Sequence, residues 1–63
     1  MKILLLNDGG GCELKAWLSR DSETINISIQ CELHQVKTEE VISLDKEDID
    51  DLICELTALR NKM

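Results

Sequence analysis

The sequence lacks the side chains that usually fill a large core and shape rigid turns. Its 63 residues include no proline, tyrosine or phenylalanine, and Trp17 is the single large aromatic residue. A core must therefore be aliphatic, and a hydrophobic content of 43% favours a folded chain over a disordered acidic tail. A chain of this length predicts one small domain, residues 1–63, which buries only about 60% of its unfolded surface. Extra stability in such a chain usually comes from disulfides, a metal or self-association.

Long apolar runs are missing as well. The short aliphatic run after Lys2 is too brief for a signal peptide or for a segment that spans a bilayer. The cysteines Cys12, Cys31 and Cys54 are odd in number, whereas a disulfide scaffold usually has an even count. These features predict a cytoplasmic protein with reduced thiols and no membrane association.

Catalytic motifs are absent too. His34 is the only histidine, and no serine, aspartate or cysteine is spaced so that a catalytic triad can be argued. A chain this short also has little room for an enclosed pocket of ordinary ligand volume. We therefore predict a protein that is not an enzyme and needs no cofactor.

One cluster of residue types suggests metal or thiol chemistry. Cys31 and His34 have the two-residue spacer of a zinc half-site, and Cys12 and Cys54 could complete four ligands. In a regular strand, however, Cys31 and His34 point to opposite faces, and Cys54 falls on the solvent side of the helix described next. A metal-binding or thiol-redox module built on these four residues is therefore an alternative to the main hypothesis below.

The last third of the chain predicts an amphipathic helix. Asp45 is placed as the N-cap, with Asp48 at the capping-box position and Leu44 and Ile49 spaced as a hydrophobic staple, so the helix should begin at Lys46. Apolar residues follow with the three- and four-residue spacing of one helical face. They are Ile49, Leu52, Ile53, Leu56, Leu59 and Met63.

The preceding residues predict strands. Residues 2–6, 13–19 and 24–33 have strand character, residues 34–40 read as a polar connection, and residues 41–44 are a candidate fourth strand. Short turns favour antiparallel neighbours. We expect an α+β fold, an antiparallel meander of three or four strands packed on one face by the C-terminal helix. The face that receives the helix should carry Leu14, Ala16, Leu18, Ile25, Ile27, Ile29, Cys31 and Leu33.

The uncovered face of this sheet predicts an interaction patch. Trp17 should lie there with one pair of first-strand residues, either Leu4 and Leu6 or Ile3 and Leu5. A tryptophan beside two aliphatic residues is typical of a docking or self-association surface. We expect a homo-oligomer or a partner protein to use this patch.

The net charge of −6 is unevenly distributed. Residues 39–55 hold eight acidic residues against Lys46 alone, so direct nucleic-acid binding is disfavoured and a partner with a basic surface is favoured. The acidic side chains expected on the exposed side of the helix are Glu47, Asp50, Asp51 and Glu55.

The leading hypothesis is a non-enzymatic interaction module, in its concrete form a small inhibitor that occupies a basic, nucleic-acid-binding site. Small acidic inhibitors made by phages and mobile elements have this general character, an analogy of size and charge only. A homo-oligomer with a ligand site between subunits is a further alternative.

Overall fold

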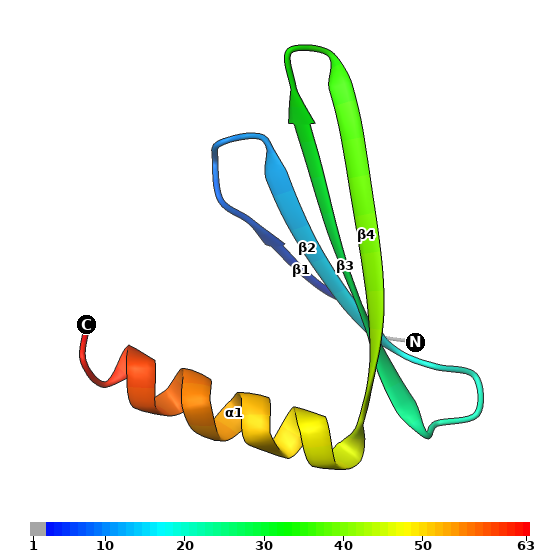
Figure 1. The fold of residues 1–63 in the computed structure, drawn as a ribbon, viewed down its shortest axis with the longest axis vertical. Coiled ribbons are helices and arrows are strands. Elements are labelled where there is room, and N and C mark those ends of the chain that lie inside the picture. The colour runs from blue at the N-terminus through cyan, green and yellow to red at the C-terminus, as the bar shows by residue number, and fades with distance from the viewer. Residues whose placement is uncertain (1–2) are drawn as a thin grey trace.

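The computed structural model describes residues 3–63 as four strands followed by one helix (Figure 1). The strands pair in the order β1-β2-β3-β4, each antiparallel to the next. This confirms the predicted α+β meander and gives it a full fourth strand. The elements are β1 Leu4–Asn7, β2 Cys12–Leu18, β3 Thr24–Leu33, β4 Val36–Asp45 and α1 Lys46–Arg60.

Strand boundaries follow the prediction closely. β3 has the predicted bounds, β2 lies one residue earlier than predicted, and β1 ends one residue later than predicted. Residue 2, which the prediction included in the first strand, lies outside the described residues. For β2 and β3 the alternation of apolar and polar side chains predicted these bounds, because it repeats every two residues as strand geometry requires, whereas β1 was predicted from its continuous aliphatic run.

The turn between β1 and β2 is held by one carboxylate and one glycine. Oδ1 of Asp8 accepts hydrogen bonds from the backbone N–H of Gly10 at 2.6 Å and of Cys12 at 3.1 Å. Gly11 has φ +99°, and a Cβ atom there would lie 2.8 Å from the carbonyl oxygen of Glu32. Only glycine fits this position, because a side chain would face both backbone strain and a clash.

The turn between β3 and β4 corrects the sequence prediction. His34 and Gln35 have φ values of 52° and 66°, so a tight two-residue turn joins the strands and β4 begins at Val36. The predicted polar connection over residues 34–40 is therefore wrong. Two left-handed residues are usual for such a turn, but the sequence has no glycine or asparagine there to signal it.

The register divides the sheet into two faces of different character. Leu4 pairs with Ala16, Ala16 with Ile27, and Ile27 with Ile42, so these side chains share one face. We call this the apolar sheet face and the opposite side the polar sheet face. The apolar sheet face carries Leu4, Leu6, Leu14, Ala16, Leu18, Ile25, Ile27, Ile29, Leu33, Val36, Ile42 and Leu44, together with Cys12, Cys31, Thr38 and Glu40.

The helix begins where the sequence predicts. Asp45 has extended backbone angles, φ −80° and ψ 177°, and its Oδ1 accepts a hydrogen bond from the N–H of Asp48 at 2.9 Å. This is the N-cap arrangement, so the predicted start at Lys46 is confirmed. Leu44 and Ile49, the predicted staple pair, are both half-buried and line the same hollow.

The helix does not cover the sheet as the sequence suggested. Figure 1 shows α1 leaving the end of β4 and running away from the strands, and it contacts only β3 and β4. No residue of α1 is buried. Because no residue separates β4 from α1, the chain has no loop with which to turn the helix back over the sheet.

The single chain consequently exposes far more surface than a compact protein of its size. Its accessible surface is 5601 Å², whereas a folded monomer of this mass exposes about 4,100 Å². The radius of gyration is 13.4 Å, compared with about 11 Å for a compact domain of this length. Within residues 3–63, no hydrophobic side chain is fully buried.

Candidate interaction surfaces

The largest unpartnered surface combines the apolar sheet face with the apolar side of α1. On the sheet, Ile29 is 49% exposed and Ile42 is 54% exposed; on the helix, Leu56 is 54% exposed. We call the helical set the helix stripe. Its members are Ile49, Leu52, Ile53, Leu56 and Leu59.

The two apolar surfaces meet at the base of the helix. Ile49, from the first turn of α1, lines a hollow of about 190 Å³ with Leu18, Ile25 and Leu44 of the sheet. The helix stripe therefore starts on the side of the apolar sheet face and diverges from it along α1. This contact is enough to orient the helix but leaves both surfaces open to solvent.

The register separates the residues of the predicted tryptophan patch. Trp17 pairs with Asn26 on the polar sheet face and is half-buried, whereas Leu4 and Leu6 lie on the apolar sheet face. The first-strand residue that shares the face of Trp17 is Leu5, which pairs with Lys15. Of the two pairs considered, the register thus places Leu5 of the second pair on the side of Trp17, because strand side chains alternate, while Ile3 of that pair lies just before β1.

The acidic side of α1 is open to solvent. Glu47, Asp50, Asp51 and Glu55 are all exposed, and we call this set the acidic helix face. At 100° per residue, these four side chains project away from the helix stripe. Carboxylates near the first turn also complement the positive end of the helix dipole, so their position stabilises the helix as well as charging its surface.

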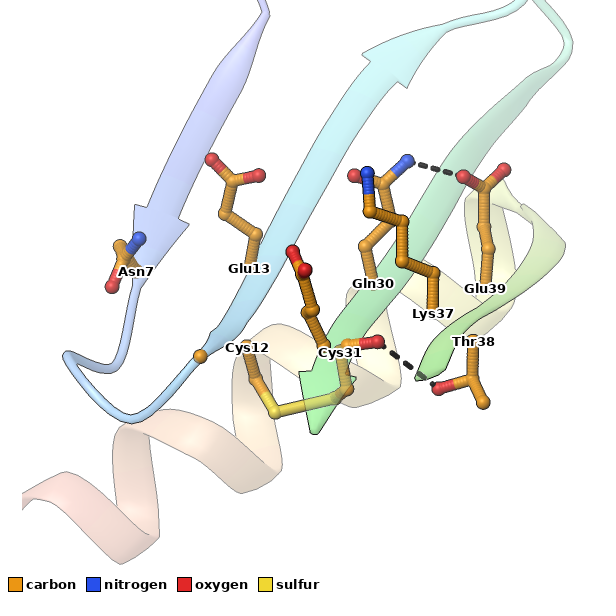
Figure 2. Close-up of a pocket in the computed structure, with 10 residues that line it drawn as sticks. Asn7, Cys12, Glu13, Gln30, Cys31, Lys37, Thr38 and Glu39 are labelled. Carbon is orange, nitrogen blue, oxygen red and sulfur yellow. Dashed lines mark hydrogen bonds between the residues drawn. A yellow bond between two sulfur atoms is a disulfide. The ribbon is translucent and has the colours of Figure 1, made fainter. Parts of the chain in front are cut away.

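A polar cleft of about 540 Å³ lies on the sheet at the end nearer the β1–β2 turn (Figure 2). Gln30 donates a hydrogen bond to Glu39 on the neighbouring strand, and the hydroxyl of Thr38 donates to the carbonyl oxygen of Cys31 at 3.4 Å. The cleft is lined by Asn7, Gly11, Cys12, Glu13, Gln30, Cys31, Glu32, Lys37, Thr38 and Glu39.

The chemistry of this cleft favours neither catalysis nor anion binding. Its charged lining is three glutamates against Lys37, so it repels phosphate and carboxylate ligands. Two of its polar side chains, Gln30 and Glu39, are already hydrogen-bonded to each other across β3 and β4. The lining offers no nucleophile beside a base, which is the arrangement that covalent catalysis needs.

The cysteines correct another prediction. Cys12 and Cys31 face each other across β2 and β3 with their Cα atoms 4.1 Å apart, and they form a disulfide (Figure 2). The expectation of three reduced thiols is therefore wrong for this pair. Cys54 is free and exposed on α1, as predicted.

The fold also separates the four ligands of the metal alternative. Cys12 and Cys31 are joined to each other, His34 lies in the β3–β4 turn, and Cys54 lies on the helix. Among residues 3–63, no three side chains of the histidine, cysteine, aspartate and glutamate types gather into a metal site.

Sequence reasoning missed the contribution of β4 to the apolar sheet face. Val36, Ile42 and Leu44 extend this face beyond β3, and Glu40 opposite Ile29 adds a charge to it. The alternation over residues 36–44 was the available signal, although two polar residues interrupt it. On the helix, the spacing of the sequence already indicated that Arg60, one turn beyond Leu56, brings a positive charge to the helix stripe.

Comparisons with known proteins give no relative. The chain matches no protein-family model, no curated protein and no solved structure. No helix within residues 3–63 is long and apolar enough to cross a membrane.

Proposed function

We propose that this chain is a non-enzymatic interaction module that binds a basic surface of another protein through the acidic helix face. The observation that carries the proposal is the position of Glu47, Asp50, Asp51 and Glu55 on the free side of a helix that stands away from its sheet. A helix presented in this way offers a row of carboxylates to a partner without any rearrangement of the sheet.

The charge distribution supports the choice of partner. Residues 39–55 concentrate eight acidic residues, and the whole chain has a net charge of −6. Such a surface speeds the encounter with a basic partner and repels nucleic acid. In its concrete form, the protein is an inhibitor that competes with DNA or RNA for a basic site, in the manner of small acidic inhibitors from phages and mobile elements.

The test is a displacement assay. Fluorescently labelled DNA is bound to a panel of basic DNA-binding domains, and its anisotropy is followed as the protein is added at several salt concentrations. We expect displacement from at least one member, weakening as salt rises because screened charges attract less. The charge-reversed variant Asp50→Lys, Asp51→Lys, Glu55→Lys should lose displacement.

The matched control reverses three glutamates on the sheet and its β2–β3 turn, outside residues 39–55. The variant Glu13→Lys, Glu23→Lys, Glu32→Lys changes the net charge by the same amount but leaves the acidic helix face intact. It should keep most of the displacement activity. Equal loss of DNA displacement in both variants would show that net charge alone explains the effect. Unchanged displacement by the helix variant would show that the acidic helix face does not bind the partner.

A thiol-redox role is the second candidate, because the sheet sets Cys12 and Cys31 opposite each other in a disulfide that is only half-buried, on the apolar sheet face. Two thiol molecules would reduce this bond to two cysteine thiols and leave as one disulfide. Intact-mass analysis of alkylated protein across a series of glutathione redox buffers checks this. A midpoint within the range of cellular thiol buffers supports a redox role, whereas a far more negative midpoint assigns the bond to structure.

A further inference from the structure

We infer that the apolar sheet face is covered by a second copy of this chain, with the helix of each copy packed on the sheet of the other. The inference goes beyond the acidic helix face, and it concerns the opposite side of the same helix. It starts from the accessible surface of 5601 Å², which exceeds that of a compact monomer by about 1,500 Å².

This excess has the size that a stable dimer needs. Two copies that each bury about 1,500 Å² share an interface of about 3,000 Å² in total, which falls within the range of obligate homodimers. The exposed side chains have the composition of such an interface as well. Ile42, Ile53 and Leu56 are all more than half exposed and all aliphatic, as expected for a domain core divided between two chains.

A second copy fits this surface better than a foreign protein. The exposed surface has two parts, a broad apolar sheet face and a narrow helix stripe, and two-layer folds pack a helix stripe on the apolar face of a sheet. A two-fold axis that places one helix on the partner sheet places the partner helix on the first sheet at the same time. Both surfaces are then buried with no further molecule.

The connection between β4 and α1 favours exchange over closure within one chain. Asp45 is both the last residue of β4 and the N-cap of α1, so no loop residue lies between strand and helix. Connections between elements usually have about four to six residues. Without them α1 contacts its own sheet only near its first turn, around Ile49, whereas the sheet of a second copy is free to approach the rest of the helix stripe (Figure 1).

Charges on the two surfaces are consistent with this arrangement. Glu40 stands on the apolar sheet face opposite Ile29, and Arg60 stands one turn beyond Leu56 at the end of the helix stripe. Exchange brings these opposite charges into one interface. The acidic helix face points outward on both copies, so the like charges of the two helices stay in water.

The first experiment measures solution mass by light scattering over a concentration series of the full chain. We expect twice the 7.1 kDa of one chain. Leu56→Asp should raise the dissociation constant at least tenfold, because it places a charge within the helix stripe. Ala58→Asp, which adds the same charge on the other side of α1, should leave the dimer intact.

A second variant keeps the proposal testable if Leu56→Asp fails to fold. A flexible insertion of about five residues between Leu44 and Asp45 supplies a connection of ordinary length. We expect this variant to become monomeric and to keep its helical circular dichroism, because α1 can then pack on its own sheet.

Two results would overturn the inference. One is a wild-type chain that stays monomeric at every concentration. The other is a dimer that persists unchanged in Leu56→Asp, because the sheets would then associate without the helix stripe, or in the insertion variant, because the missing loop would then not be what drives the exchange. No basic partner is present in these measurements, so their outcome is independent of the proposed inhibitor function.

Discussion

The carboxylate of Asp45 accepts a hydrogen bond from the backbone N–H of Asp48 at 2.9 Å, and this bond fixes the point where the sheet becomes a helix. Replacing Asp45 with alanine should lower the free energy of unfolding by about 1 kcal/mol, since an orphan N–H of the first turn loses its acceptor. Asp45→Asn keeps an acceptor oxygen and should recover most of the loss. Urea unfolding at one fixed chain concentration checks both, and equal losses would show that the cap bond is not the cause.

The Cys12–Cys31 disulfide should stabilise the chain by restricting its unfolded state. The two cysteines are 19 residues apart in sequence, and closing a loop of that size contributes about 3 kcal/mol in the chain-entropy model. Reduction of the wild type should lower the free energy of unfolding by about that amount. The reductant should have no effect on the variant Cys12→Ala, Cys31→Ala, and Cys54→Ala should behave as wild type.

Ser28 carries a buried hydroxyl without a partner. The residue is 2% exposed, and its Oγ makes no hydrogen bond. Ser28→Ala should therefore raise the free energy of unfolding by about 1 kcal/mol, because the unmet cost of burying the hydroxyl disappears. Ser43→Ala is the matched control, since the Ser43 hydroxyl donates to Oδ1 of Asn26 at 2.5 Å and its loss should be destabilising. A loss of stability in Ser28→Ala would contradict this account.

Stability should fall in acid partly through Asp8. The backbone N–H groups of Gly10 and Cys12 donate to this carboxylate and hold its pKa below the ordinary value of 3.8. Because the folded pKa is the lower one, the contribution is complete above about pH 4 and is lost as the pH falls through the folded pKa. NMR titration of the side-chain carboxyl carbon should show the low pKa, and Asp8→Asn should weaken the acid dependence. A pKa at or above 3.8 would refute the prediction.

Opposite charges on the two exchanged surfaces give a test of exchange by mixing. Arg60→Glu and Glu40→Arg should each weaken the homodimer, because both of its helix–sheet contacts then bring like charges together. A mixture of the two variants restores an opposite pair at both contacts, so heterodimers should dominate in native mass spectrometry. Random mixing would mean that Arg60 and Glu40 do not meet across the interface.

Local signals predicted the parts of the fold that depend on neighbouring residues. The bounds of β3 followed from ten residues of alternation, and the start of α1 followed from Asp45, Asp48 and the staple pair. β4 was underestimated because the turn at His34 and Gln35 carries no glycine or asparagine, and because residues 36–40 are mostly polar. Their strand conformation depends on pairing with β3, which is a non-local effect.

The candidate surfaces were predictable in composition but not in placement. The amphipathic pattern of α1 predicts that its apolar side packs on another apolar surface. The pattern does not predict that the helix leaves its own sheet uncovered. The disulfide depends on the register that sets Cys12 opposite Cys31, which spacing alone does not give. The same register separates Leu4 and Leu6 from Trp17, a division that the sequence left open between two pairs.

The order of the elements also shapes how the sheet forms. Every strand pairs with its neighbour in sequence, so the sheet consists of hairpins that close in microseconds. None of these pairings needs α1, which contacts only β3 and β4. The outer strand β4 carries Lys37 and Glu39 along its length. Charges on an edge strand hinder the addition of a foreign strand, so they lower the tendency of the open sheet to aggregate.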